Sequence, residues 1–207
     1  MNKSESEISY TGKYTPLSRT ELVKKLQEAL TPSRFNHVLR VEQTAIQLAQ
    51  KYGESVEKAS IAGLVHDYAK QRPDADFIRA IKQYRLDDNL LNYGNAIWHG
   101  VVGWLFVAKE LQIENIDILK AVEYHTVGHQ YMSKLAQIVY MADYIEPGRD
   151  FPGGVSKARE ATEISLAAGG VSCQTQQTLS YLIENKLPVY PQTIITYNAW
   201  VPVQTKE

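Results

Sequence analysis

The stretch from Ile61 to Arg72, IAGLVHDYAKQR, constrains the fold most strongly because it places a His66-Asp67 pair near the end of an apolar helical segment. Burying such a pair without a partner costs several kcal/mol, or forces the carboxylate to take up a proton. A neutral imidazole beside a carboxylate is a suitable pair of ligands for a borderline divalent cation. The segment therefore predicts a helix that ends at a polar site inside the protein.

Helical periodicity runs along most of the chain and predicts an all-α protein with one domain. Apolar residues recur at spacings of three and four, and capping residues, Pro or Gly separate the periodic segments. We expect a flexible tail at 1–16, the domain at 17–198 and a tail end at 199–207. The LPVYPQTIITYNAW segment within this region should run extended along the body. The predicted helices span 18–30, 33–52, 55–71, 73–84, 96–111, 116–126, 133–146, 156–168 and 172–186.

Composition excludes several classes of partner. The net charge of -1 provides no basic field for counterion-driven binding to nucleic acid. No run of apolar residues is long enough for a membrane span, since His99 interrupts the nearest candidate, Ile97–Ala108. Cys173 is the only cysteine, and the first residues contain no apolar secretory segment. We therefore expect a cytoplasmic protein without nucleic-acid or membrane partners, and we leave a homodimer open.

Histidines and aspartates recur beside apolar positions on several predicted helices. Any one of them is more simply explained as a core or surface residue, but their joint occurrence is harder to explain in this way. Asp143 also lies in the last turn of its helix, where an anion opposes the helix dipole at a cost of about 0.3–1 kcal/mol unless a cation compensates. His129 lies in a predicted loop. The candidate ligands are His37, His66, Asp67, His99, His125 and Asp143.

The order of these residues resembles the HD-domain phosphohydrolases, in which one His precedes the His-Asp pair and a distant Asp follows it. Four phrases make the chain similar to the bacterial YqeK family within that superfamily. They are HDYAK (66–70), WHGVVG (98–103), EYHTVGH (123–129) and MADYIEPGRDFPG (141–153). The resemblance covers roughly residues 20–198, and its small departures are Glu123 and Gly153-Gly154. A His-Asp pair is a weak motif, whereas these phrases in this order are specific.

This resemblance implies an HD-domain helical bundle that hydrolyses diadenosine tetraphosphate symmetrically into two ADP with the help of iron. By the family pattern, the metal ligands would be His37, His66, Asp67 and Asp143. Mixed nitrogen and oxygen ligands suit Fe(II), Mn(II), Ni(II) or Zn(II) better than Mg(II) or Ca(II). One metal is expected, and a second is left open. Asp67 could also orient or deprotonate the attacking water, as the His-Asp pair is thought to do in the superfamily.

Other residues are candidates for contacts with the substrate. His99 and His125 stand at predicted helix ends, where they would hold a second metal or hydrogen-bond phosphate and leaving group, and we favour the second role slightly. Basic residues near the ligands in sequence could neutralise phosphate oxygens, and Tyr190 could cover an adenine. We assign catalytic roles to Asp67, His99, His125 and Lys70, and nucleotide or phosphate contacts to Arg34, Lys70, Arg72, His99, His125, Arg149 and Tyr190.

Two other functions fit the same residues. The first is an HD-type nucleotidase or a phosphohydrolase of another nucleotide, because the sequence does not show the size of the substrate pocket. The second is a non-catalytic nucleotide-sensing or scaffolding module with a relic site. The complete set of candidate ligands argues against a relic, which has no reason to keep buried charges.

Overall fold

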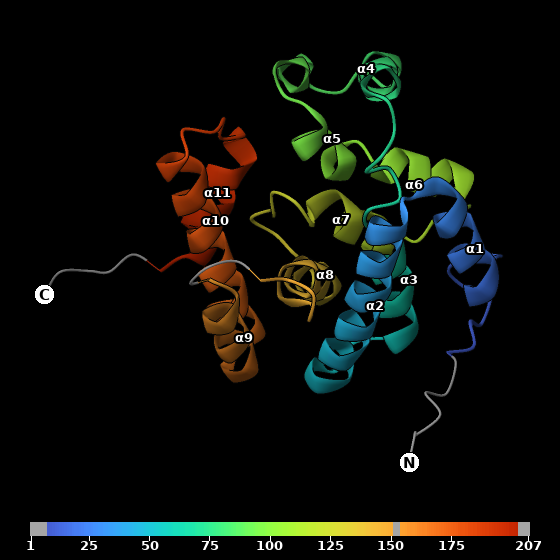
Figure 1. Cartoon of the computed structure of the whole chain (residues 1–207), viewed down its shortest axis with the longest axis horizontal. Coiled ribbons are helices and arrows are strands. Elements are labelled where there is room, and N and C mark those ends of the chain that lie inside the picture. The colour runs from blue at the N-terminus through green and yellow to red at the C-terminus, as the bar shows by residue number, and fades with distance from the viewer. Residues whose placement is uncertain (1–7, 151–153, 203–207) are drawn as a thin grey trace, which may run out of the picture.

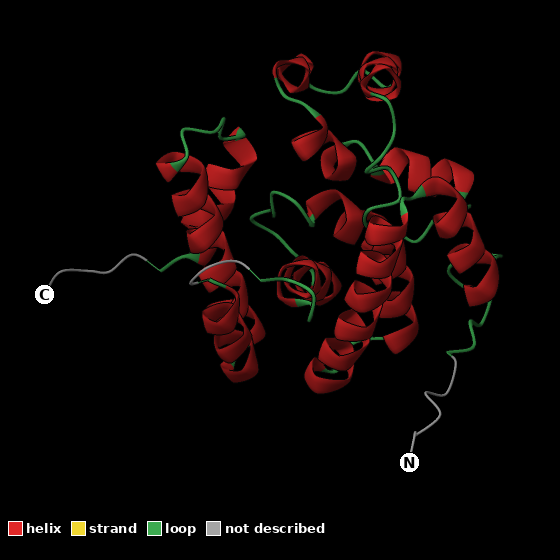
Figure 2. Ribbon diagram, in the orientation of Figure 1, coloured by secondary structure: helices red, strands yellow, loops and turns green. Residues whose placement is uncertain are grey.

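The computed structural model describes residues 8–150 and 154–202. Figure 2 shows helices and loops throughout this part of the chain, which confirms the all-α class. The α-helices are α1 (Arg19–Ala29), α2 (Pro32–Tyr52), α3 (Val56–Val65), α4 (Asp74–Gln83), α5 (Asn95–Val101), α6 (Trp104–Glu110), α7 (Ile116–Tyr124), α8 (Lys134–Ile145), α9 (Val155–Ile164), α10 (Ser172–Glu184) and α11 (Pro191–Trp200). A 3-10 helix, η1 (Asp88–Asn92), and a π-helix, η2 (Leu166–Val171), complete the elements.

Helix α8 is the centre of the bundle. It packs against α2, α3, α7, α9 and η2, and Figure 1 shows it end-on between the α2–α3 pair and the group of α9, α10 and α11. Ser133 caps its first turn by accepting a hydrogen bond from the backbone of Ala136. Apolar residues cover nearly its whole circumference, as expected of a helix surrounded by others. Its buried residues are Leu135, Ala136, Ile138, Val139, Tyr140, Met141, Ala142 and Ile145.

Helices α2 and α3 lie close together because Gly63 has no side chain at their contact. A Cβ at Gly63 would lie 3.0 Å from the Cα of Glu42 and 3.3 Å from the Cβ of Ala45. Glu42 is itself fully buried, and its carboxylate accepts hydrogen bonds from Arg19 Nε (2.7 Å), Arg19 Nη2 (2.6 Å) and Ser60 Oγ (2.6 Å). This buried ion pair ties α1 to the two helices that carry the first candidate ligands.

Helix α3 is shorter than the sequence predicts. It ends at Val65, and the chain then runs through turns up to Pro73, with backbone bonds from Lys70 to Asp67 and from Arg72 to Ala69. These bonds span three residues instead of four, so the segment is wound more tightly than an α-helix. His66 and Asp67 consequently stand at the helix end, inside the protein.

The predicted helix at 96–111 is two helices, α5 and α6, with a turn at Val102-Gly103. Glycines permit this geometry, because a Cβ at Gly103 would lie 1.8 Å from the carbonyl oxygen of His99. At Gly100, a Cβ would lie 2.6 Å from Thr126 Oγ1, so the glycine lets α5 approach the end of α7. Periodicity shows both halves as helical, but it does not show the change of direction between them.

A small second core holds α5 in place above the main bundle. Phe77 of α4 packs against Trp98 of α5 and edge-on against Phe106 of α6. The indole of Trp98 also donates a hydrogen bond of 2.7 Å to the carbonyl of Leu90 in η1. His99 follows Trp98 directly, so this core fixes the helix that carries it.

The C-terminal segment is helical and not extended as predicted. Its β-branched residues favour an extended chain, but Pro191 at the first helical position is compatible with a helix start. Thr193 and Thr196 are buried against the body, and the Thr196 hydroxyl donates to the carbonyl of Val127 at 3.0 Å. Tertiary contacts therefore override the local preference.

The first residues that the structure describes are packed against the body. Tyr10 Oη and Ser60 Oγ lie 2.8 Å apart, and the buried Thr15 hydroxyl donates to the carbonyl of Leu111 at 3.1 Å. A flexible tail over 1–16 therefore does not describe residues 8–16, while residues 1–7 and 203–207 lie outside the described part. The domain limits of 17–198 stay a prediction. Among residues 8–150 and 154–202, none of the helices has the length and apolarity needed to cross a membrane.

Candidate metal centre

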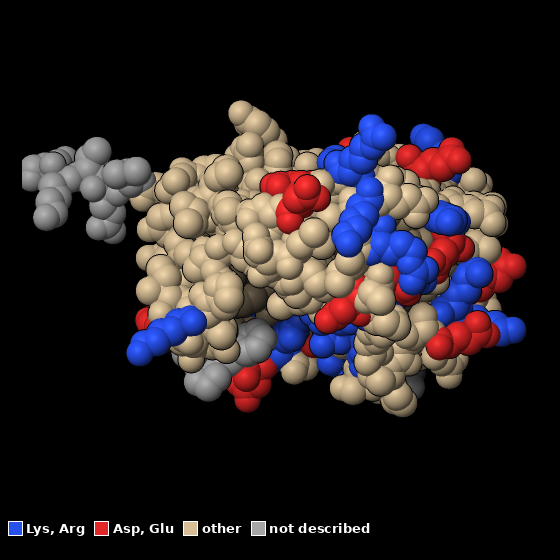
Figure 3. Space-filling model, turned by 90° about the horizontal axis from the view of Figure 1, so that it is seen from above, with Lys and Arg blue, Asp and Glu red and all other residues tan. Residues whose placement is uncertain are grey.

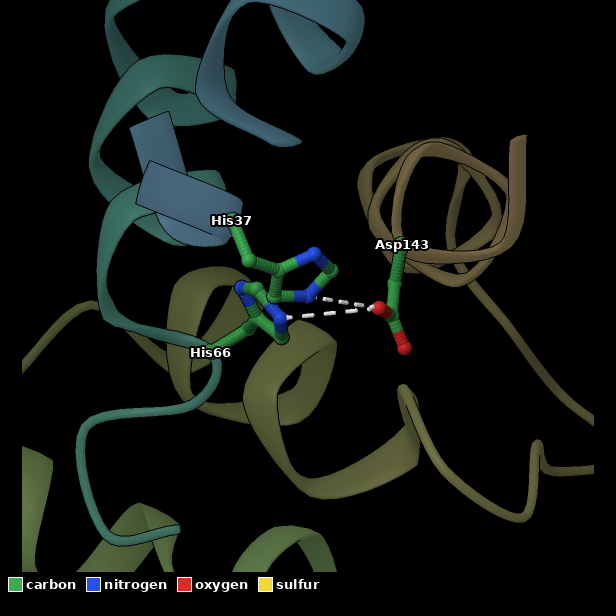
Figure 4. A group of neighbouring side chains, drawn as sticks. All are labelled: His37, His66 and Asp143. Carbon is green, nitrogen blue, oxygen red and sulfur yellow. Dashed lines mark ion pairs between the residues drawn. The ribbon is translucent and has the colours of Figure 1, made fainter. Parts of the chain in front are cut away.

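Three side chains from three helices converge at one point beside α8. Figure 4 shows His37 of α2, His66 at the end of α3 and Asp143 of α8 pointing toward one another. Asp143 Oδ1 lies 3.0 Å from His37 Nε2 and 3.8 Å from His66 Nε2. His66 is completely buried and His37 nearly so. These three residues form one group that could hold a metal ion.

Asp67 extends this group toward two further histidines. Its Oδ2 lies 3.8 Å from His37 Nε2 and 3.6 Å from His66 Nε2. Its other oxygen, Oδ1, lies 3.4 Å from His99 Nε2 and 3.7 Å from His125 Nε2. The carboxylate of Asp67 therefore lies between two pairs of imidazoles, and His66, Asp67 and His125 form a second group with metal-binding spacing.

Hydrogen bonds at the far side of each ring fix the proton positions. The Nδ1 atoms of His66, His99 and His125 lie 2.6–2.7 Å from the backbone carbonyls of Gly63, Asn95 and Val122. A carbonyl only accepts, so each Nδ1 carries the proton. In a neutral ring, Nε2 then carries a lone pair and can only accept a hydrogen bond or bind a cation.

Burial keeps the imidazoles of His66 and His99 neutral. The pKa of His66 is lowered to about 4 and that of His99 to about 3, in each case mainly because burial disfavours the charged ring. Burial would raise the pKa of Asp67, but its surroundings hold it well below the ordinary value, and the Arg34 guanidinium donates to its Oδ2 at 2.8 Å. At neutral pH, lone pairs of imidazole therefore face carboxylate oxygens.

A cation resolves this crowding of acceptors. His66 Nε2 is buried and has no hydrogen-bond partner among the described residues, and a buried polar atom without a partner costs about 1–3 kcal/mol. Imidazole nitrogens with carboxylate oxygens are the donor set of Fe(II), Mn(II), Ni(II) and Zn(II) sites. The residues present therefore fit a divalent transition metal held by His37, His66, Asp67 and Asp143.

Three predicted cationic residues do lie at this centre. Arg34 Nη1 donates to Asp67 Oδ2 at 2.8 Å, and Arg149 Nη2 donates to Asp143 Oδ1 at 2.5 Å. Arg149 also supplies the cation that the position of Asp143 in the last turn of α8 requires. Lys70 Nζ lies 3.2 Å from both ring nitrogens of His99, and burial lowers its pKa.

Two predicted site residues lie elsewhere. Arg72 pairs with Glu110 and stacks on the ring of Phe106, 4.3 Å from its centroid, so the structure does not bring it to the cluster. It follows Lys70 by two residues, but the turn directs its side chain between α4 and α6, where it lines a cavity of about 210 Å³. Tyr190 packs edge-on against Tyr93, with no contact to the histidines recorded among the described residues.

Sequence reasoning missed the residues that support the ligands. Glu146 is 1% exposed, and its carboxylate contacts His37 Nδ1 at 3.0 Å. Burial would raise its pKa, but hydrogen bonds from Arg40, His37 and the backbone of Gly148 lower it to about 2. Thr126 Oγ1 lies 3.2 Å from His99 Nε2 and 3.1 Å from His125 Nε2. Glu146 stands in the phrase MADYIEPGRDFPG, one turn after Asp143. This position was the feature of the sequence that could have indicated a residue near the ligands.

A family model described as HD domain matches residues 34–148, more than half of the chain. A crystal structure described as a predicted HD superfamily hydrolase involved in NAD metabolism, from Clostridium acetobutylicum, has the same fold. Its TM-score is 0.83, with 35% sequence identity over 89% of this chain and 97% of that one. Fold and site together define an HD-domain protein.

Two relatives align along most of the chain. The symmetrical bis(5'-nucleosyl)-tetraphosphatase of Bacillus subtilis (strain 168) is 37% identical over 182 residues, which cover 88% of this chain and 97% of the relative. The protein of that name from Staphylococcus aureus (strain NCTC 8325 / PS 47) is 35% identical over 183 residues, covering 86% and 92%. The chain belongs to the family of symmetrical bis(5'-nucleosyl)-tetraphosphatases within the HD-domain superfamily, which confirms the resemblance seen in the sequence.

Replacing one proposed ligand should remove the metal. We expect His66→Ala and Asp67→Ala to lose bound metal on desalting, whereas the wild type retains it, because metal binding at this centre needs ligands from separate helices. His129→Ala is the matched control, since its ring stacks on Tyr124 outside the cluster. Elemental analysis after desalting measures the outcome. Wild-type metal content in both ligand variants would contradict the assignment.

The buried histidines should make the metal-free protein sensitive to acid. His99 has an ordinary pKa of 6.5 and a folded-state pKa of about 3. Above pH 6.5 it contributes nothing to pH dependence; as pH falls below this value the unfolded chain takes up a proton that the folded chain refuses, so stability falls until about pH 3. His99→Leu should decline less steeply than wild type in urea unfolding series with a chelator present. Equal slopes would contradict this expectation.

Proposed function

We propose that this protein hydrolyses diadenosine tetraphosphate symmetrically to two ADP, with a divalent transition metal held by His37, His66, Asp67 and Asp143. The observation that carries the proposal is the convergence of the Nε2 atoms of His37 and His66 on two ionised carboxylates, Asp67 and Asp143. It occurs in a chain that aligns with 97% of a symmetrical bis(5'-nucleosyl)-tetraphosphatase. A relic module would have no reason to keep this costly arrangement, so we favour an enzyme over a sensor.

The reaction replaces a phosphorus–oxygen bond of the central anhydride by a bond to water. The metal supplies Lewis acidity that polarises a phosphate oxygen and lowers the pKa of water. Asp67 is ionised and lies between the two pairs of histidines, so its carboxylate can accept a hydrogen bond from the attacking water and orient it. Attack at either of the two central phosphorus atoms leaves one ADP as the departing group and forms the other.

Cationic side chains can neutralise the tetraphosphate. Arg34 and Arg149 now donate to Asp67 Oδ2 and Asp143 Oδ1, the two oxygens that face His37 and His66. When a cation binds those oxygens, the guanidinium groups can donate to phosphate instead, with the bidentate geometry that arginine favours. Lys70, beside His99, would contact a further phosphate oxygen. Tyr190 remains our candidate for covering one adenine.

The geometry changes the role that we propose for His99 and His125. In each ring Nδ1 donates its proton to a carbonyl. While the ring is neutral, Nε2 therefore carries only a lone pair and cannot donate a hydrogen bond to a phosphate oxygen. Both lone pairs face Asp67 Oδ1. We therefore favour ligation of a second metal over the phosphate contact that the sequence suggested.

Iron is the metal that we propose for the cell, and the cytoplasm is the compartment. The mixed donor set suits Fe(II), although Mn(II), Ni(II) and Zn(II) have similar preferences. Cys173 is half buried, and burial raises the pKa of its thiol, so it is an unreactive free cysteine of the kind found in reducing compartments.

We also propose that two copies associate through α10 and α11. Between Ser165 and Pro202 the charged residues are Glu184 and Lys186 only. Figure 3 shows most of the charged side chains on the right half of the view, whereas the left half is mostly uncharged. Exposed apolar groups of this kind mark interaction surfaces. The exposed apolar residues of this region are Tyr181, Ile183, Leu187, Ile194 and Ile195. Light scattering should give twice the monomer mass of 23.4 kDa, and a monomer at micromolar concentration would contradict the dimer.

The products of hydrolysis test the activity directly. Metal-loaded wild-type protein should convert diadenosine tetraphosphate to ADP as the sole nucleotide product, because attack at a central phosphorus divides the chain equally. Chromatography of early time points measures this outcome, and His66→Ala should show no turnover. AMP with ATP as first products would refute symmetrical cleavage, whereas hydrolysis of a mononucleotide in preference would point to a nucleotidase.

A further inference from the structure

One of the four clustered histidines is held differently from the others. His66, His99 and His125 direct Nδ1 to a backbone carbonyl three or four residues earlier in the chain. His37 instead directs Nδ1 to a side-chain carboxylate, that of Glu146, at 3.0 Å. We propose that Glu146 is a positioning residue that sets the metal affinity of the centre through His37. This inference rests on the proposed metal centre.

Glu146 is fixed from several sides. Arg40 donates from Nε to Oε2 at 2.5 Å and from Nη2 to Oε1 at 3.1 Å. The backbone N–H of Gly148 donates to Oε2 at 2.5 Å. With His37 Nδ1, four donors therefore serve the two oxygens of a carboxylate that is 1% exposed. Such a carboxylate has little freedom to rotate away from the ring that it orients.

The turn after α8 is built around this contact. A Cβ at Gly148 would lie 2.5 Å from both Nε and Nη2 of Arg40, so a side chain there would displace the guanidinium. Arg159 of α9 donates to the carbonyls of Ile145, Glu146 and Arg149 and holds the backbone of the same turn. Glycine at 148 thus leaves the room that Arg40 needs to reach Glu146.

A carboxylate affects the ring more strongly than a carbonyl does. It carries a full negative charge, so a hydrogen bond from Nδ1–H to it makes Nε2 a more basic ligand and fixes the ring plane. His37 Nε2 is also the imidazole nitrogen nearest to Asp143 Oδ1, at 3.0 Å. Loss of an outer partner of this kind lowers metal affinity by about 10–100-fold.

Glu42 provides a matched control. It is also a fully buried glutamate on a bidentate arginine, Arg19, but its other side-chain partner is Ser60 and not a clustered histidine. Glu146→Gln and Glu42→Gln therefore each remove the charge of a buried glutamate that pairs with a partly exposed arginine. Only the first pair touches a proposed ligand, so a general loss of stability would affect both variants and a loss of positioning would affect one.

The test measures Mn²⁺ affinity of full-length protein by electron paramagnetic resonance of the free ion. Glu146→Gln should raise the dissociation constant by about 10–100-fold, while Glu42→Gln stays within about twofold of wild type and shows a similar loss of melting temperature without metal. Unchanged affinity in Glu146→Gln, or equal losses in both variants, would overturn the proposal.

A second measurement covers the case in which a variant does not fold or wild type binds no metal. Nitrogen-15 spectra of the histidines in metal-free wild type should show Nδ1 of His37 protonated and strongly hydrogen-bonded. Arg40→Gln, which loosens the hold on Glu146, should shift these signals while leaving those of His125 in place. A His37 ring with its proton on Nε2 would overturn the proposal. Wild type without affinity for any of the transition metals would instead refute the metal centre itself.

Discussion

The structure depends on one electrostatic constraint: imidazole nitrogens and carboxylates, which are hydrogen-bond acceptors, lie close together inside a helical bundle. Three backbone carbonyls and one carboxylate accept hydrogen bonds from the Nδ1 atoms of four histidines, so the Nε2 atoms all turn toward Asp67 and Asp143. Without a cation this arrangement is unfavourable, because acceptors face acceptors at low dielectric. Arg34 and Arg149, whose side chains are partly exposed, relieve part of it by donating to these two carboxylates. The remaining demand for positive charge defines what the site can bind.

The fold positions each histidine ring close to the end of an element or to the start of a helix, so that the rings converge on one site. The close contact of α2 and α3 at Gly63 brings His37 and His66 together, and central α8 supplies Asp143. The second core around Trp98 fixes α5 and therefore His99. Backbone carbonyls anchor the rings of His66, His99 and His125, and the Glu146 carboxylate in the turn after α8 anchors the ring of His37, so the geometry of the cluster is a property of the fold.

Much of this was predictable from the sequence, and what was not has physical reasons. The cluster could be predicted because His and Asp in apolar helical segments are costly, and because the phrases around them are specific. The turn at Gly103 and the helix α11 could not, because tertiary contacts override local propensity there. Arg72 follows Lys70 closely, yet the tight turn after His66 sends the two side chains in different directions. Glu146 was missed because a glutamate near a helix end ordinarily reads as surface charge.

The central position of α8 has a consequence for the lifetime of the protein in the cell. Asp143 of α8 is linked through the proposed metal ion to His37 of α2 and to His66 at the end of α3. The bundle therefore cannot open at its centre without releasing that ion. Binding to the folded state alone stabilises it in proportion to the logarithm of free ligand concentration. Metal supply would thereby govern how often the bundle opens to proteases, and starvation for the metal would shorten the survival of the chain itself.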